Sequence, residues 1–396
     1  AKGVGKTATA SRFAATTIEL DNPDQAELAI VHPTRLRTAK PPVLLDEWQR
    51  APRIWDLVRR AVDAGAPAGS FILTGSATPS APSHSGAGRI VRVRLRPMGL
   101  SERAVETPSV SFAELISDRP ARLEGETGIG LEQYVDEILA SGFPGIRAVA
   151  GRNRERALDG YLHAIVEHDF AELGHVVRRP EALKAWLTAF AAATGGTARY
   201  EAILDAATSG ISDKPSRGAT IAYRDALARL WVLDQLPAWL PTRNRLAALT
   251  QAPKHFLADP ALAAALLGVD AQQLTERPRP GKIAVRDGTL LGALFEHLAV
   301  LSVRALAGPS GARAGHLRTK GGEHEVDLVV ERRDGRVLAI EVKLAPAPSA
   351  ADVANLVWLK RRLGPDVVDA VVLTTGPMAY RRPDGIGVVP LALLGA

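Results

Sequence analysis

The sequence contains no cysteine among its 396 residues and no long run of uncharged apolar residues. Without thiols the chain can form neither disulfides nor thiolate metal sites, and their absence agrees with a reducing compartment, so we expect a cytoplasmic protein. A membrane-spanning helix needs about 18 or more consecutive apolar residues, so we expect no membrane span. A long basic run is also missing. The net charge of +6 therefore permits nucleic acid as a partner without implying it.

The length predicts two or three domains, because one hydrophobic core rarely serves a chain of this size. Hydrophobic residues make up 46% of the sequence and charged residues 23%, which is typical of a soluble globular protein. The first residue is Ala1 rather than Met, and it stands in the middle of a motif. We therefore expect a fragment of a longer chain that lacks at least one strand.

The motif is the end of a phosphate-binding loop, G-x-x-x-x-G-K-[ST], whose first glycine would precede Ala1. Glycines let backbone N–H groups curl around phosphate oxygens, Lys6 brings a positive charge to the outer phosphates, and the Thr7 hydroxyl can bind Mg²⁺. This predicts ATP and Mg²⁺ as cofactors and weak nucleotide binding by this stretch alone. The candidate nucleotide-binding residues are Gly3, Val4, Gly5, Lys6 and Thr7.

A second nucleotide signature follows an apolar strand expected at 43–45, which ends in Asp46 and Glu47. A buried strand of this kind delivers one carboxylate to the Mg²⁺ shell, here Asp46, while Glu47 can orient and polarise the attacking water. The alternative is a strand that merely ends in two acidic residues. A helix is expected after it, because apolar residues recur at helical spacing between 54 and 62.

Two further catalytic candidates come from the next strands. The apolar strand 71–73 ends in Thr74 and Ser76, either of which can sense the γ-phosphate or the attacking water; the alternative is a plain turn. Arg89 precedes an expected last strand, 90–95, and is the candidate for an arginine that stabilises the transition state. A solvated charge at the strand end is the other interpretation of Arg89.

Taken in order, these stretches resemble a bacterial family of AAA-type ATPases that carry a C-terminal region of unknown function. The resemblance rests on GKT (5–7), LLDEWQRAP (44–52), FILTGSATP (71–79) and GRIVRVRLRPMGLSE (88–102), and it extends over nearly the whole chain. It implies a parallel P-loop sheet in which the strand 71–73 lies between the loop strand and the Asp46 strand. Because the loop strand precedes Ala1, the sheet is then expected to have an open position beside the strands that end in Asp46 and Thr74.

The middle of the chain is expected to be helical. A helix over 157–173 carries His163, His168 and Asp169, which suggest either a metal or, with no third ligand in view, a solvated face. Residues 197–233 predict helix, turn, helix and strand, and they resemble the winged-helix module of the family. Basic residues on or before its second helix are candidates for DNA contact, with internal packing as the alternative: Lys214, Arg217, Arg224 and Arg229.

The last third resembles the PD-(D/E)xK restriction-endonuclease-like core. Glu296 lies on an expected helix, Asp327 in an expected strand, and Glu341 with Lys343 in the next strand. The acidic residues can hold Mg²⁺ for water activation, and Lys343 can steady the charge on phosphate. A folded remnant with acidic surface residues is the alternative.

The turn between these two strands determines whether Asp327 joins Glu341. A two-residue loop pairs residue 327 with 342, whereas a three-residue loop with Gly335 in the left-handed conformation pairs 332 with 336 and 327 with 341. We predict the three-residue loop.

The expected architecture is α/β: a P-loop ATPase domain (1–118), a helical and winged-helix-like middle (119–270) and a nuclease-like α/β domain (281–396). The expected function is that of an ATP-binding, Mg²⁺-dependent AAA ATPase, with DNA as a candidate partner and a homo-oligomer as a candidate assembly. Two alternatives stand beside it: an ATP-regulated, Mg²⁺-dependent DNA nuclease, and a nucleotide-gated scaffold for another protein.

Overall fold

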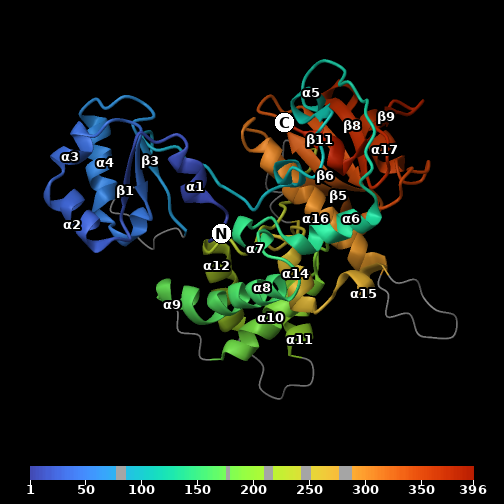
Figure 1. The fold of residues 1–396 in the computed structure, drawn as a ribbon. Helices are drawn as coiled ribbons and strands as arrows, with labels where there is room; N and C mark the ends of the chain where they lie inside the picture. The colour runs from blue at the N-terminus through green and yellow to red at the C-terminus, as the bar shows by residue number, and fades with distance from the viewer. Residues whose placement is uncertain (77–85, 175–178, 209–216, 242–250, 276–287) are drawn as a thin grey trace.

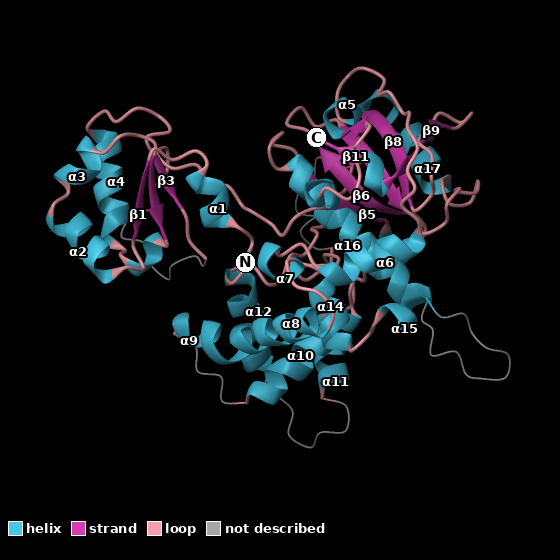
Figure 2. Ribbon diagram, in the orientation of Figure 1, coloured by secondary structure: helices cyan, strands magenta, loops and turns pink. Residues whose placement is uncertain are grey.

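The computed structural model describes residues 1–76, 86–174, 179–208, 217–241, 251–275 and 288–396. An N-terminal α/β lobe stands apart from the remainder of the molecule, which combines a helical region and a second sheet (Figure 1). The strands gather in two separate places, with most of the helices between and below them (Figure 2). One candidate residue from the sequence, Lys214, lies outside the described residues.

The N-terminal lobe is built on a three-stranded parallel sheet of order β1-β2-β3. Strands β2 and β3 lie where the sequence predicts them, and β2 is buried along its whole length, as expected of a central parallel strand. Val43, Leu45 and Ile54 are buried in its core. The elements of the lobe are α1 (Lys6–Ser11), β1 (Thr16–Glu19), α2 (Pro23–Val31), α3 (Thr34–Thr38), β2 (Val43–Asp46), α4 (Arg53–Asp63) and β3 (Phe71–Leu73).

The expected strand over 90–95 is wrong. These residues form no strand, and the side chains of Val91 and Val93 are 88% and 86% exposed. A strand is stable only when a neighbour accepts its backbone hydrogen bonds, and in the described part of the chain the one strand that pairs with β3 is β2. The segment runs instead toward the rest of the molecule, where Arg94 and Arg96 pair with the buried Asp234 at 2.9 and 2.8 Å.

The middle of the chain is helical, as predicted. The expected helix over 157–173 consists of α8, a π-helical turn (Ile165–Asp169) and α9, so it is longer and less regular than expected. The helices described in this region are α6 (Leu131–Ala140), α7 (Pro144–Arg147), α8 (Arg152–Ala164), α9 (Phe170–Glu172), α10 (Pro180–Ala192), α11 (Tyr200–Ala207), α12 (Arg217–Arg229), α14 (Pro260–Leu267) and α15 (Ala271–Thr275).

A short sheet-like pairing closes this helical region after α12. Leu236 and Lys254 exchange two backbone hydrogen bonds, and Leu233 pairs with Leu257 in the same antiparallel sense. His255 also pairs with Thr194, which follows α10. Helices α10, α11 and α12 are thus followed by two extended segments, 232–236 and 254–258, that lie side by side.

The C-terminal domain contains a six-stranded mixed sheet of order β5-β6-β7-β8-β10-β9. Helix α16 contacts β5, β6 and β7, whereas α17 packs on the other face against β6, β7 and β8. The described elements are α16 (Gly288–Ala307), β5 (Arg313–Arg318), β6 (Glu325–Glu331), β7 (Val337–Val342), α17 (Ala354–Leu363), β8 (Val367–Thr374), β9 (Tyr380–Arg381), β10 (Gly387–Pro390) and β11 (Leu394–Gly395).

Helix α16 contains a stretch, Leu290–Ala307, that is long and apolar enough to cross a membrane, and 61% of this stretch is buried within the structure. It packs beneath the C-terminal sheet, and Leu294, Phe295 and Leu298 are fully buried. Among the described residues, α16 therefore lies where a helix of the hydrophobic core lies.

The expected domain boundary at residue 118 does not coincide with a break in packing. Strand β4 (Val110–Ser111) leads into α5 (Phe112–Leu115) and pairs with β11 at the other end of the chain. Residues 119–130, placed by the sequence analysis in the middle domain, also lie against the C-terminal domain, because Glu126 bridges to Met378 and Leu123 is buried. The segment after the N-terminal lobe therefore packs with the C-terminal domain.

Candidate functional site

The residues of the phosphate-binding motif form a tight loop before α1. Gly3 and Gly5 have φ angles of 73° and 86°, a left-handed conformation that side chains disfavour, so the loop needs glycine at both positions. Helix α1 begins at Lys6, immediately after Gly5. Its free N–H groups and its dipole make this helix end attractive to anions.

Asp46 lies at the carboxyl end of β2 and connects the loop to the sheet. The Thr7 hydroxyl lies 3.0 Å from both Asp46 carboxylate oxygens, and the Thr74 hydroxyl donates to Asp46 Oδ1. Asp46 and Thr74 are buried, with 7% and 8% exposure. Three residues that are far apart in the sequence are thus brought together at one edge of the sheet.

Glu47 adopts a left-handed backbone with φ of 50°, which is uncommon for a residue other than glycine. This conformation turns its carboxylate toward the next strand, where the Ser76 hydroxyl donates to Glu47 Oε1 at 3.1 Å and Gln49 donates to Glu47 Oε2. Strained backbone of this kind is common at functional sites. The carboxylate is therefore held in a fixed orientation beside Asp46.

Lys6 completes the group. Burial lowers its pKa below the ordinary value, and the nearby charge of Lys2 acts in the same direction, while the carboxylates of Glu47 and Asp46 oppose the shift. Its ammonium group donates to the Ala1 carbonyl at 3.0 Å. A half-buried cation beside a helix N-terminus and two acidic residues can bind a phosphate that a divalent cation also contacts.

The loop also rests on the middle region, which sequence reasoning missed. Lys2 pairs with Asp169 at 2.6 Å, and the Tyr161 hydroxyl donates to the Lys2 carbonyl at 3.2 Å. A methyl group on Gly3 would lie 3.8 Å from Phe143, and Phe143 packs against Tyr161 with ring centroids 4.8 Å apart. Long-range pairs of this kind leave no periodic signal in a sequence.

Arg89 does not join the site in this structure. It pairs with Asp63, the last residue of α4. Since α4 begins just after β2 and runs back along the sheet, its last turn lies away from the strand ends that carry Asp46 and Thr74. Of the candidate catalytic residues, the structure brings together Glu47, Thr74 and Ser76.

The candidate acidic residues of the C-terminal domain, Glu296, Asp327 and Glu341, belong to a second group of charged side chains. The predicted three-residue loop is confirmed: Arg332 N–H donates to the Arg336 carbonyl at 2.8 Å, Gly335 has φ of 88°, and Leu328 pairs with Ile340. The ladder ends there. Asp327 stands next to a register shift between β5 and β6, so its carboxylate turns aside and accepts the Val342 N–H at 3.0 Å.

A lysine from the middle region occupies the centre of this cluster. Lys254, 1% exposed, places its Nζ 2.8 Å from Glu296 Oε1, 2.8 Å from Asp327 Oδ1 and 3.1 Å from Glu325 Oε1. Sequence reasoning passed over Lys254. Its one available signal was a charged residue inside an apolar extended segment, where burial requires partners.

Glu341 is neutralised separately, by Lys343 at 2.7 Å, and its other oxygen, Oε2, is buried without a hydrogen-bond partner in the described part of the chain. The expected metal site of Glu296, Asp327 and Glu341 is therefore not formed. Among the described residues no group of three or more His, Cys, Asp or Glu side chains is placed to hold a metal ion. The physical reason is that the Lys254 ammonium group lies between Glu296 and Asp327, while the Lys343 ammonium group contacts Glu341.

Burial governs the protonation of this cluster. It raises the pKa of Glu296 and of Glu341 to about 8 each, and the charge of Asp327 adds to both shifts. Burial also acts on Asp327, but the charge and hydrogen bond of Lys254 outweigh it and hold the pKa of Asp327 below its ordinary value. The carboxylates raise the pKa of Lys254, which stays charged at neutral pH.

The histidines and Asp169 on the helix 152–172 form no site. His163 pairs with Glu167 at 2.9 Å on the exposed face, while Asp169 is 5% exposed and turns inward to Lys2. The expected solvated face is thus right for His163 and wrong for Asp169, because an apolar helix face brings Asp169 against the loop.

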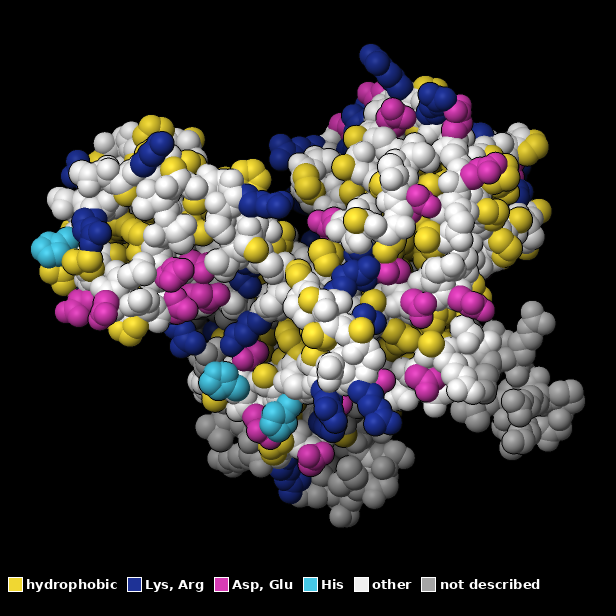
Figure 3. Space-filling model, viewed as in Figure 1, with side chains coloured by type: hydrophobic (Ala, Val, Ile, Leu, Met, Phe, Trp, Pro, Cys, Tyr) yellow, Lys and Arg dark blue, Asp and Glu magenta, His cyan; other side chains and the backbone are white. Residues whose placement is uncertain are grey.

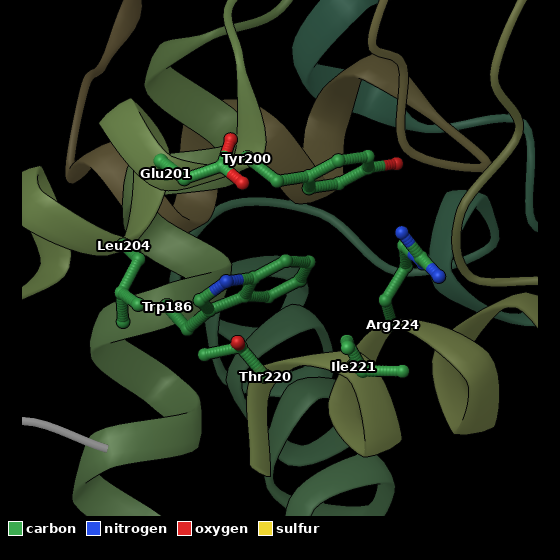
Figure 4. Close-up of a pocket in the computed structure, with 7 residues that line it drawn as sticks. All are labelled: Trp186, Tyr200, Glu201, Leu204, Thr220, Ile221 and Arg224. Atoms are coloured by element: carbon green, nitrogen blue, oxygen red, sulfur yellow. The ribbon is translucent and has the colours of Figure 1, made fainter. Parts of the chain in front are cut away.

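Arg224 on α12 packs against its neighbours in the structure. Arg224 stacks over the Tyr200 ring at 5.0 Å and contacts Asp225, and it lines a small pocket with Trp186, Tyr200 and Ile221 (Figure 4). Arg217 and Arg229 lie at the two ends of α12. On the face shown in Figure 3, Lys and Arg side chains are interspersed with Asp and Glu.

Comparisons with known proteins divide the chain into three regions. Residues 1–104 match a family described as an AAA domain, residues 131–273 a domain of unknown function (DUF8612), and residues 291–394 a domain of unknown function (DUF4143). The N-terminal region is thus similar to AAA-type P-loop ATPases.

Two curated relatives share 27% identity with this chain over 313 residues: uncharacterized protein Mb2031c of Mycobacterium bovis and uncharacterized protein Rv2008c of Mycobacterium tuberculosis. The matched region covers 78% of this chain and 59% of each relative, so the chain spans about three fifths of the length of the proteins it resembles. No solved structure matches.

Proposed function

We propose that the chain belongs to an Mg²⁺-dependent ATPase whose nucleotide is held by residues 3–7. The observation that carries the proposal is the convergence of Thr7 and Thr74 on Asp46. They meet at the edge of a parallel sheet that lies within the region similar to the AAA domain. A Mg²⁺ ion between the β- and γ-phosphates needs oxygen ligands of this kind beside a phosphate-binding loop.

The proposed roles follow from these positions. Lys6 engages the β- and γ-phosphates, Thr7 and Asp46 hold the Mg²⁺ shell, and Glu47 orients the attacking water. Thr74 and Ser76 reach these two carboxylates from the neighbouring strand, so their hydroxyl groups can report the presence of the γ-phosphate. Arg89 has no role in this arrangement.

The experiment is steady-state ATP turnover of the chain in Mg²⁺, with Glu47→Gln as the test variant. The amide keeps the size of the side chain and removes its ability to polarise water, so we expect a loss of about 10²–10⁴-fold in turnover with little change in ATP affinity. Glu27→Gln, on the exposed surface of α2, is the matched control. Turnover that survives unchanged in Glu47→Gln would overturn the catalytic assignment.

The helical middle, proposed to be a winged-helix-like module, supplies the candidate DNA contact. Support comes from three helices followed by two paired extended segments, 232–236 and 254–258. The stacking of Arg224 on Tyr200 favours internal packing over groove contact. Turnover measured with and without duplex DNA distinguishes the two, because a DNA-coupled ATPase changes its rate and loses that change steeply as salt is added.

A further inference from the structure

A pocket of about 150 Å³ opens on the helical region, between α10, α11 and α12. Its lining comes entirely from the region similar to DUF8612 and is separate from the phosphate-binding loop and from the acidic residues of the C-terminal domain. A space of this size holds one small ring. The lining side chains are shown in Figure 4: Trp186, Tyr200, Glu201, Leu204, Thr220, Ile221 and Arg224.

The aromatic walls of the pocket are held in place by their neighbours. Trp186 is 1% exposed and stacks on Phe190, with ring centroids 5.4 Å apart. Tyr200 packs against His255 at 5.3 Å, and the Arg224 guanidinium group lies 5.0 Å from the centre of the Tyr200 ring. A ligand would therefore meet a preformed surface, which lowers the entropy cost of binding.

A chain of hydrogen bonds anchors Tyr200 at its hydroxyl end. Burial lowers the pKa of His255, so its ring is neutral, and its Nε2–H donates to the Ala198 carbonyl at 2.7 Å. The other ring nitrogen, Nδ1, is then an acceptor. Gln235 Nε2 donates one hydrogen to this Nδ1, at 3.1 Å, and the other to the Tyr200 hydroxyl oxygen. The Tyr200 ring is thus a fixed wall.

The indole nitrogen of Trp186 is an unsatisfied polar group in the lining of this pocket. Trp186 Nε1 is buried and has no hydrogen-bond partner among the described residues. In the view of Figure 4 it lies between Glu201 and Thr220. Buried N–H groups are nearly always paired in folded proteins, so this one favours a ligand that brings an acceptor.

The charged groups of the lining narrow the class of ligand. The Glu201 carboxylate only accepts hydrogen bonds, whereas the Arg224 guanidinium group, on the opposite side of the pocket in Figure 4, only donates them. A simple anion would be repelled by Glu201, and an apolar ring would leave the indole N–H unpaired. A small flat ring whose N–H group stands between two carbonyl groups matches these donors and acceptors. Aromatic rings and guanidinium planes also stack on rings of this kind.

We propose that the pocket binds a uracil-type base, the pyrimidine-2,4-dione ring of uridine and thymidine, as a free nucleoside or as an unpaired base of a strand. The ring N3–H donates to Glu201, one carbonyl group accepts from Trp186 Nε1–H, and the other faces Arg224. Cytosine carries an acceptor at N3, which the Glu201 carboxylate rejects. This inference does not rest on the ATPase proposal.

The test is isothermal titration calorimetry of the full chain, without ATP, against uridine, cytidine and the single-stranded oligonucleotides oligo(dT) and oligo(dC). We expect uridine or oligo(dT) to bind at least about tenfold more tightly than its cytosine counterpart, because a site built for hydrogen bonds rejects a ring that reverses them. Binding of free uridine identifies a nucleoside ligand. Binding of oligo(dT) without binding of uridine identifies an unpaired base in a strand.

Variants of the lining show whether this pocket is responsible. Trp186→Phe keeps an aromatic ring and removes the N–H, and Glu201→Gln keeps the size of the side chain and replaces an acceptor by an N–H donor. Each should weaken binding of the uracil-type ligand at least about tenfold. Glu201→Gln should also reduce the preference over cytosine, since its amide can donate to cytosine N3. Glu181→Gln, on the exposed first turn of α10, is the matched control and should change neither affinity.

Three results would overturn the inference: no binding of uridine or oligo(dT) at millimolar concentration, equally tight binding of the cytosine ligands, or binding that Glu201→Gln leaves unchanged. Glu201 is exposed, so its substitution by glutamine does not disturb the core. If Trp186→Phe does not fold, Glu201→Gln and its change of preference therefore decide the matter.

Discussion

The ammonium group of Lys2 lies 2.6 Å from Asp169 Oδ1, although 167 residues separate them in the chain. The pair joins the loop of the phosphate-binding motif to a π-helical turn of the middle region. Π-helical turns occur often at functional sites. The ionic contact makes the position of the loop depend on the middle region as well as on the sheet that carries Asp46.

The Lys2–Asp169 pair should contribute measurable coupling between the two regions. In a double-mutant cycle of Lys2→Ala and Asp169→Ala we expect a coupling free energy of about 1 kcal/mol, since Asp169 is buried and Lys2 is partly shielded. Urea unfolding of the four proteins measures it. Arg122 and Glu124, a pair with mostly exposed side chains, serve as control and should show almost none. Equal coupling in both pairs would contradict the proposed contact.

Gly142 should not tolerate a side chain. A methyl group there would lie 2.5 Å from the Met98 carbonyl oxygen, a backbone atom that cannot move aside easily. We expect Gly142→Ala to lower the free energy of unfolding by about 1–3 kcal/mol, as overpacking does. Gly145→Ala, in the same turn, meets no atom within 4 Å and should be nearly neutral. Thermal unfolding of the two variants provides the comparison.

Asp234 should be among the most sensitive charged positions. It is 5% exposed, and Arg94, Arg96 and Arg304 place guanidinium nitrogens 2.8–2.9 Å from its carboxylate. Together they outweigh the effect of burial and hold the pKa of Asp234 below its ordinary value. Asp234→Ala leaves buried cations without a counter-ion.

The expected cost of Asp234→Ala is about 3–5 kcal/mol, measured by chemical denaturation. Asp384→Ala removes the partner of Arg382 at the surface and should cost less than about 1 kcal/mol. A similar small cost at both positions would show that the buried cluster stabilises the fold little.

Stability should fall with rising pH through the Glu341 carboxyl. Its folded pKa, raised to about 8, exceeds the unfolded value of 4.5, so the folded state holds a proton that the unfolded state has lost. The stabilisation is fully present below pH 4.5 and is lost as the pH rises to 8, at no more than about 1.4 kcal/mol per pH unit.

Glu341→Gln mimics the protonated carboxyl and should reduce the slope of unfolding free energy against pH between pH 6 and 8, leaving the part that comes from Glu296. Glu331→Gln, at the far end of the neighbouring strand β6, should leave it unchanged. Denaturation curves at several pH values check this. An unchanged slope in Glu341→Gln would place the titration elsewhere.

The order of elements was largely predictable because local patterns carry it. Buried parallel strands appear as short apolar runs, and the runs that end in Asp46 and Thr74 fall where β2 and β3 end. The turn at Gly335 was predictable to the residue, since loop length sets strand register. Both follow from residues that are near one another in the sequence.

What sequence reasoning missed depends on distant partners. The segment 90–95 alternates like a strand, yet a strand also needs a neighbour, and a pattern cannot supply one. Lys254 and Asp169 looked like ordinary charges until folding placed them against Asp327 and Lys2. The expected metal site was wrong for the same reason, because three acidic residues in the right order do not reveal a lysine that folds between them.

The pairing of β4 with β11 makes the C-terminal domain discontinuous in sequence. Val110 and Leu394 lie on adjacent strands, and the sequence of the helical region lies between these two residues. The helical region is thus an insertion, tethered to its host at two covalent points. A cut between residues 111 and 131 would therefore remove β4 from the C-terminal domain, and β11 would lose the strand with which it pairs.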